Sequence, residues 1–156
     1  PLKDPSTFDG PGKELFSSND VPDAANIVEH PMVWREEDTF FLLYSRGQGD
    51  NATYQIAYAT SKGAQGPFTQ QGVLFRSDDN PGVNTPKKVI APGASSIVRD
   101  ADKNTWMVYR QKTGVADTFG DRFVAIDPVT FKPGQLTIEG HPSRGEKRKA
   151  PAAIGP

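Results

Sequence analysis

Residues 32–45, which read MVWREEDTFFLLYS, carry the clearest structural signal in this sequence. A short apolar run ends at a charged turn at residues 35–39, and an aromatic-rich run follows it. β-branched and aromatic residues favour strands, and two such runs around a short polar turn are typical of a β-hairpin. Residues 96–111, SIVRDADKNTWMVYRQ, have the same form. The two hairpins are about 65 residues apart, which indicates a structural repeat.

Short strand-like runs also make up most of the remaining chain. The 15 Gly and 14 Pro residues interrupt the sequence throughout, and no stretch keeps the spacing of an amphipathic helix over three turns. Repeated antiparallel sheets of this kind are typical of β-propeller blades. We therefore predict an all-β fold with strands near residues 32–35, 40–45, 54–60, 73–76, 96–99, 106–111, 123–127 and 136–138.

The two ends differ in composition from the middle. Residues 1–26 are rich in Pro, Asp, Ser and Gly, which predicts an extended surface segment. Residues 27–139 form the predicted β domain, and residues 140–156 form a basic tail rich in Pro and Gly. Lys147, Arg148 and Lys149 supply too few charges to favour a nucleic-acid site over a solvated tail.

Composition narrows the choice of partner. Eighteen basic and 19 acidic residues leave a net charge of -1, so we expect neither nucleic acid nor a membrane surface as partner. No apolar run approaches the roughly 20 residues that cross a bilayer. The absence of Cys excludes disulfides, thiolate zinc sites and a cysteine nucleophile. Because the chain starts at Pro1, we expect a processed chain or an excerpt, and the sequon at Asn51 favours a secreted protein.

A set of motifs between residues 28 and 138 resembles the glycoside hydrolases of family 43, which include arabinofuranosidases, xylosidases and arabinanases. The motifs are VEHPMVW (28–34) with FFLLYS (40–45), YQIAYATS (54–61) with GPF (66–68), APGASSIV (91–98), WMVYR (106–110) and DRFVAID (121–127). The resemblance implies the C-terminal portion of a five-bladed β-propeller, with about two to three blades present.

The resemblance also implies a role for Glu29. In the family, an Asp base, a second Asp that tunes the acid and a Glu general acid project into a central pocket, and water inverts the anomeric centre. Glu29 matches the general acid. Met32, Trp34 and Phe41 could supply the apolar wall that such an acid needs. The alternative is that Glu29 is only a polar residue before a strand.

This sequence also departs from the family pattern. Both Asp positions precede the Glu in the family and find no match here. The upstream carboxylates Asp4, Asp9, Asp20 and Asp23 lack the apolar strand that would hold a base. Ala94 stands where the family has a central His that helps to hold a metal ion or water, and Arg110 stands at another His position. We therefore expect no metal or cofactor, although family members may hold a central calcium or other ion.

Four further residues are predicted to bind substrate. They are His30, which could turn into the site, Trp34, Arg110 and Arg122, whose planar guanidinium suits hydroxyls and carboxylates. Each also has a structural reading, because a single His is often a surface or core residue, and an Arg can close a blade by pairing with an Asp.

Two functions of different class follow. The first is an inverting glycosidase, incomplete in this chain, that acts on arabinose- or xylose-containing plant polysaccharide. The second is a non-catalytic carbohydrate-binding or protein-interaction module. Its sugar-stacking faces would be aromatic rings that otherwise form blade core, namely Trp34, Tyr44, Tyr58, Trp106 and Tyr109. Exposed blade faces should be covered, so another part of the chain, a second polypeptide or a second copy could complete the propeller.

Overall fold

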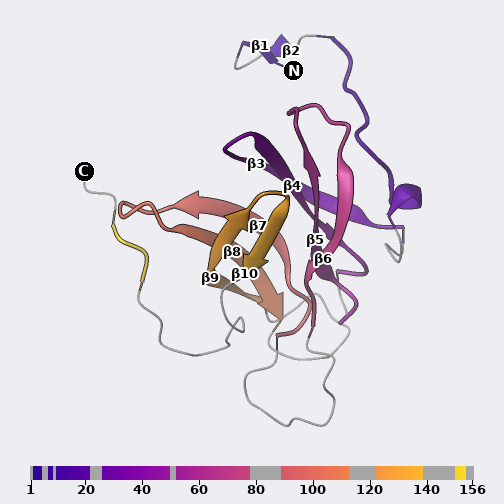
Figure 1. The fold of residues 1–156 in the computed structure, drawn as a ribbon. Coiled ribbons are helices and arrows are strands. Elements are labelled where there is room, and N and C mark those ends of the chain that lie inside the picture. Colours follow the sequence, from indigo (N-terminus) through magenta and orange to yellow (C-terminus); the bar gives the residue numbers. More distant parts are fainter. Residues whose placement is uncertain are drawn as a thin grey trace.

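Two four-stranded antiparallel sheets form the main part of the described structure (Figure 1). The computed structural model describes residues 2–4, 7–8, 10–21, 26–49, 52–77, 89–112, 122–138 and 150–153. Within them, β1 (Leu2–Asp4) and β2 (Thr7–Phe8) form a small separate pair, and η1 (Ser18–Asp20) is a single turn of 3-10 helix. No helix in these ranges has the length and apolar character needed to cross a bilayer.

Each sheet is a meander in which consecutive strands pair. The first blade contains β3 (Val28–Glu36), β4 (Thr39–Arg46), β5 (Gln55–Ser61) and β6 (Thr69–Phe75). The second blade contains β7 (Gly93–Arg99), β8 (Thr105–Lys112), β9 (Arg122–Lys132) and β10 (Gln135–Ile138). The predicted all-β fold, its eight main strands and the repeat are therefore confirmed.

Several strands are longer than predicted: β3 begins at Val28 and β7 at Gly93, and two further strands extend well beyond their predicted ends. β6 begins at Thr69, because the polar run before Val73 pairs with β5 at the edge of the sheet. β9 continues past Asp127 to Lys132 even though Pro128 lies within it. Its last four residues pair with β10 across a turn that contains Gly134 at φ 72. Pairing with β10 across this tight turn therefore keeps residues 129–132 in the strand after the proline.

The two strands at the contact between the blades share a backbone irregularity. β3 has a bulge between Glu29 and Met32, and β7 has a bulge between Gly93 and Ser96. In each bulge a non-glycine residue has a left-handed backbone, His30 at φ 53 and Ala94 at φ 51. Bulges bend a strand and redirect its side chains. The two blades therefore share the bulge in their first strand as well as their regular strand pairing.

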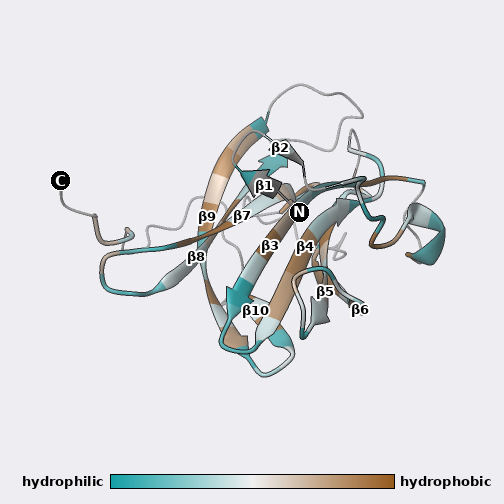
Figure 2. Cartoon of the chain, turned by 90° about the horizontal axis from the view of Figure 1, so that it is seen from above, coloured by the Kyte–Doolittle hydropathy of each residue, from teal (hydrophilic) through white to brown (hydrophobic). Residues whose placement is uncertain are grey.

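A hydrophobic core joins the two blades. Alternate residues on β4 and β5 face the second blade, and Figure 2 shows β4 as markedly hydrophobic. Full burial of a large apolar side chain contributes about 1.5–3 kcal/mol, so this core stabilises the pair of blades more than either sheet alone. The buried members are Phe41, Leu43, Ile56, Tyr58, Phe75, Val89, Ile97, Met107, Tyr109, Val129 and Leu136.

The N-terminal segment packs on the other face of the first blade. Phe16 makes an edge contact with Tyr44, with ring centroids 5.1 Å apart, and Val21 is buried in the same cluster. η1 is held by a capping box between Ser17 and Asp20. The segment predicted to be extended thus contributes side chains to a small core, because its few apolar residues meet the face of the blade that carries Tyr44.

The far face of the second blade remains open in the described residues. Val98, Val124 and Ile126 are all exposed, and register places them on one side of the sheet. Part of the predicted C-terminal tail lies nearby: residues 150–153 run beside the β7–β8 turn, where the Ala152 N–H donates to Asp100. Residues 140–149, including Lys147, Arg148 and Lys149, lie outside the described residues.

Candidate functional site

Glu29 lies at the start of β3, where the two blades meet. It pairs with Ser45 on β4, and the bulge follows immediately. Its side chain is 44% exposed, so a ligand can reach the carboxyl group. The Tyr54 hydroxyl donates a hydrogen bond of 2.6 Å to Glu29 Oε1. One carboxyl oxygen is therefore held by the protein.

Tyr54 is fully buried and joins both blades. Its ring lies so close to Gly93 that a Cβ atom there would come within 1.9 Å of Tyr54 Cε1. The Arg110 guanidinium carbon lies 4.4 Å from the ring centroid, a cation–π contact. Burial raises the pKa of Tyr54 above the ordinary 10.0 of a phenol, and the hydrogen bond to Glu29 adds to the rise. The Tyr54 hydroxyl therefore keeps its proton at neutral pH and can donate a hydrogen bond.

His30 is the second titratable neighbour of the candidate acid. Its Nδ1 lies 3.1 Å from the Tyr54 hydroxyl and 3.7 Å from Glu29 Oε1. The hydroxyl has a single proton, which is directed at Glu29, so His30 must carry a proton on Nδ1 if both hydrogen bonds exist together. His30 therefore supports the oxygen of Tyr54, and half of its own side chain remains exposed.

The second blade reaches the same hydroxyl through Ser45. The Ala94 N–H donates to Ser45 Oγ at 2.8 Å. Ser45 in turn hydrogen-bonds to Tyr54 and lowers the pKa of that phenol, against the stronger effect of burial. Ala94 stands where the resemblance places a central His. Its backbone amide, exposed by the bulge, takes part in the site although its side chain cannot.

The two predicted arginines border Gly49, in the turn after β4. Arg122 Nη2 donates to the Gly49 carbonyl at 3.1 Å. A Cβ atom at Gly49 would lie 3.4 Å from Arg110 Nη2 and 3.8 Å from Glu29 Oε1, so all three groups converge there. Arg110 Nη1 is buried without a hydrogen-bond partner. Glu29, His30, Arg110 and Arg122 are therefore brought together.

Trp34 is placed elsewhere. It lies five residues further along β3, roughly 16 Å from Glu29 at about 3.3 Å per residue. Its ring stacks on Phe131 at the other end of the blades, and its Nε1 donates to Glu36. The other aromatic residues considered for sugar stacking, Tyr44, Tyr58, Trp106 and Tyr109, are at most 8% exposed and form core.

The apolar wall beside Glu29 also differs from the prediction. Met32, Trp34 and Phe41 belong to the core between the blades. A pocket of about 190 Å³ instead borders Glu29 on its other side, lined by Leu15, Phe16, Val28, Pro31, Leu42 and Tyr44. The N-terminal segment thus contributes to the surroundings of the candidate acid. Of the upstream carboxylates, Asp20 is used to cap η1, Asp4 lies on β1, and Asp9 and Asp23 lie outside the described residues.

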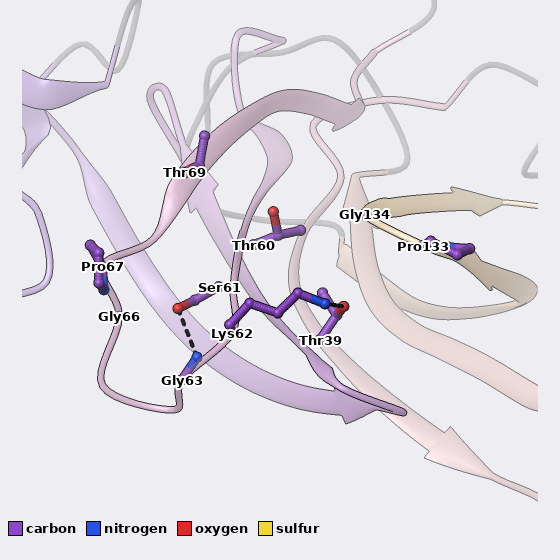
Figure 3. Close-up of a pocket in the computed structure, with 10 residues that line it drawn as sticks. All are labelled: Thr39, Thr60, Ser61, Lys62, Gly63, Gly66, Pro67, Thr69, Pro133 and Gly134. Atoms are coloured by element: carbon purple, nitrogen blue, oxygen red, sulfur yellow. Dashed lines mark hydrogen bonds between the residues drawn. The ribbon is translucent and has the colours of Figure 1, made fainter.

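No metal site is evident in the described ranges. They contain no group of three or more His, Cys, Asp or Glu side chains that could hold a metal ion. A cleft of about 520 Å³ lies at the opposite end of the blades from Glu29 (Figure 3), where Lys62 donates to Thr39. Its lining offers hydroxyls and glycines but no carboxylate: Thr39, Thr60, Ser61, Lys62, Gly63, Gly66, Pro67, Thr69, Pro133 and Gly134.

Comparison with known proteins identifies the family and the fold. The family model described as glycosyl hydrolases family 43 matches residues 3–136. A search of curated proteins found no significant match.

Solved structures share the fold. A thermostable family-43 glycoside hydrolase is 24% identical, with a TM-score of 0.68, over 92% of this chain and 44% of its own. An α-L-arabinofuranosidase from Lactobacillus brevis is 20% identical, with a TM-score of 0.70, over 87% of this chain and 44% of its own. A xylan β-1,4-xylosidase from Bacillus halodurans is 17% identical, with a TM-score of 0.59, over 83% of this chain and 26% of its own. The chain thus spans less than half the length of each of these structures.

Proposed function

This chain belongs to family 43 of the glycosyl hydrolases, and on that basis we propose that it supplies the general acid of an inverting glycoside hydrolase. The observation that carries the proposal is the accessible Glu29 carboxyl group, held at one oxygen by Tyr54 where two propeller blades meet. The similar structures named as an arabinofuranosidase and a xylosidase support arabinose- or xylose-containing plant polysaccharide as substrate.

In the proposed reaction, Glu29 transfers its proton to the oxygen of the glycosidic bond as the bond from that oxygen to the anomeric carbon breaks. A water molecule attacks the anomeric carbon from the opposite face and gives its proton to a carboxylate base. The products are a hemiacetal of inverted configuration and a free hydroxyl on the leaving group. The base and the Asp that tunes the acid would come from outside the described residues, through a second copy or another polypeptide segment.

Three neighbouring side chains would contact the sugar. Arg110 and Arg122 border Gly49 beside the carboxyl group, and their guanidinium groups can donate to sugar hydroxyls. His30 is half exposed next to Glu29. Trp34 has no part in this proposal, because it lies at the other end of β3.

The working environment is also part of the proposal. A protein that degrades plant polysaccharide meets its substrate outside the cell, so we expect secretion, in agreement with the sequon at Asn51. Acid–base hydrolysis of this kind needs carboxyl groups and water alone, so we expect no metal or cofactor to be required for the chemical step.

The test compares the wild-type chain with Glu29→Gln, using Glu37→Gln in the exposed β3–β4 turn as a matched control. Release of sugar would be measured from arabinan, xylan and aryl arabinosides and xylosides. We expect Glu29→Gln to lower kcat/KM by about a hundredfold or more, the usual contribution of a general acid, and Glu37→Gln to have no effect. Folded wild-type protein that releases no sugar would refute an acid–base site formed by this chain alone or by copies of it, and sugar binding without hydrolysis would then identify a binding module.

A further inference from the structure

We infer that Tyr54 is the positioning residue of the site, because it occupies Glu29 Oε1 and leaves Oε2 as the oxygen that carries and delivers the proton. The inference rests on the proposed role of Glu29 as general acid. It starts from a geometric fact: the short hydrogen bond from the Tyr54 hydroxyl ends on one named oxygen of the carboxyl group.

The direction of this hydrogen bond follows from the groups around the hydroxyl. An ionised carboxylate can only accept, and a protonated carboxyl group accepts at its carbonyl oxygen. Tyr54 can therefore keep donating to Oε1 in both states of Glu29, provided that the acid proton resides on Oε2. A charge-assisted bond of this kind is stronger than a neutral one, so the arrangement favours a single orientation of the carboxyl group.

The position of the hydroxyl is itself fixed from the second blade. The ring of Tyr54 fills the space left by the missing side chain of Gly93 and lies beneath the Arg110 guanidinium. Ser45, anchored by the Ala94 N–H, contacts the same hydroxyl. A fully buried ring with these neighbours has little freedom to move. The second blade thus determines where the acid of the first blade points.

Positioning matters because a general acid must meet the departing oxygen within hydrogen-bond reach. Glu29 is accessible, and its side chain would otherwise exchange among several rotamers. Removal of the Tyr54 hydroxyl would leave the carboxyl group in place but free its orientation. Hydrolysis that depends on proton delivery would slow, whereas departure of a leaving group that needs no proton would not.

The first test detects the hydrogen bond between Tyr54 and Glu29 and does not require an active protein. The phenol carbon shifts of the four tyrosines would be followed against pH by NMR in the wild type and in Glu29→Gln. We expect the pKa of Tyr54 to fall toward the ordinary value of a phenol in the variant, because the negative charge of Glu29 contributes to its rise. Tyr44 is the internal control, since burial raises its pKa and its hydroxyl donates to Gln70 rather than to Glu29. An unchanged Tyr54 titration would overturn the inference.

The second test separates positioning from general damage. Tyr54→Phe and the matched variant Tyr44→Phe, which also removes a buried hydroxyl, would be assayed on aryl glycosides with a poor leaving group and with dinitrophenol. We expect Tyr54→Phe to lower kcat about tenfold on the poor leaving group, the effect of one hydrogen bond to a charged group, and less than about twofold on dinitrophenol. Tyr44→Phe should affect the two substrates equally.

The outcomes keep the two proposals apart. Equal losses on both substrates in Tyr54→Phe would mean that Tyr54 is only structural, and would overturn the inference while leaving Glu29 as the acid. A wild-type chain without activity would refute an acid–base site formed by this chain alone or by copies of it, while the titration of Tyr54 would still show whether the tyrosine holds the carboxyl group.

Discussion

The two blades use the same backbone for different purposes. In each, the first strand opens with a bulge and a left-handed residue, and register makes Glu29 equivalent to Gly93 and His30 equivalent to Ala94. The first blade thus places a carboxyl and an imidazole at the positions where the second has a hydrogen atom and a methyl group. The second blade contributes space, through Gly93, and a backbone donor, through Ala94. A site can therefore arise from a repeat when one copy keeps the functional groups and the other becomes their support.

The largest effect should come from filling the space at Gly93. A Cβ atom there would overlap the Tyr54 ring at 1.9 Å, and the ring is enclosed on its other side by Arg110. Because Gly93 has no left-handed backbone, the effect of Gly93→Ala is purely steric. We expect a loss of about 3 kcal/mol in the free energy of unfolding, typical of severe overpacking, measured by urea denaturation.

Gly12→Ala is the matched control, because a Cβ atom at Gly12 meets nothing within 4 Å. It should change the free energy of unfolding by less than about 0.5 kcal/mol. If Gly93→Ala were as mild as this control, Tyr54 would not be enclosed, and the supporting role of the second blade would be lost.

An intermediate effect is expected at the β7–β8 turn, which differs from the shorter β3–β4 turn. Burial opposes ionisation of Asp100, but hydrogen bonds from Trp106, Asn104 and the Ala152 N–H outweigh it and hold its pKa at about 2. A folded-state pKa below the ordinary 3.8 stabilises the fold above about pH 4, and this stabilisation is lost as pH falls toward 2. Asp100→Asn should therefore lower the melting temperature by several degrees at pH 7.

The pH dependence provides the check on Asp100. The difference in melting temperature between wild type and Asp100→Asn should narrow between about pH 4 and pH 2, as the wild-type carboxylate becomes protonated. A difference that stays constant over this range would mean that the charge of Asp100 does not stabilise the turn.

The smallest effect should come from the ion pair that joins the blades far from Glu29. Arg99 Nη2 lies 2.6 Å from Glu36 Oε2, but the two side chains are 42% and 29% exposed. Exposed pairs contribute about 0–1 kcal/mol and are screened by salt. Glu36→Gln should lower the free energy of unfolding by less than about 1 kcal/mol, and the loss should shrink in high salt. A loss above about 2 kcal/mol would place the main link between the blades at this end.

Most of the fold could be predicted from the sequence, because strand runs and turn residues act locally. Both hairpins and the repeat follow from residues that lie next to one another along the chain. The bulges could not be predicted, since Ala rarely adopts a left-handed backbone and His, although enriched there, adopts it in only a small share of its positions. The packing of Phe16 on Tyr44 likewise could not be predicted, because it depends on how the N-terminal segment folds back onto the first blade.

The candidate site was predicted only in part. Glu29, His30, Arg110 and Arg122 do converge, but the sequence could not show that Trp34 lies at the far end of the same strand. Tyr54, Ser45 and Gly93 were missed as members of the site. Tyr54 and Gly93 stand in the quoted motifs YQIAYATS and APGASSIV, yet their contact depends on the docking of one blade on the other. Local sequence patterns predict the strands, whereas the contacts of the candidate site form only where the two blades pack together.

The meander topology has a consequence for the order of folding. Every strand pairs with its neighbour in sequence, so each sheet can close through short loops, which is rapid. The contacts between blades join residues 49, 63 and 73 positions apart and must wait for longer loops to close. We expect both sheets to form before they dock. A folding intermediate with both sheets formed but not docked would lack the contacts of Tyr54 with Gly93 and Arg110, so the orientation that we propose for Glu29 would be among the last features to form.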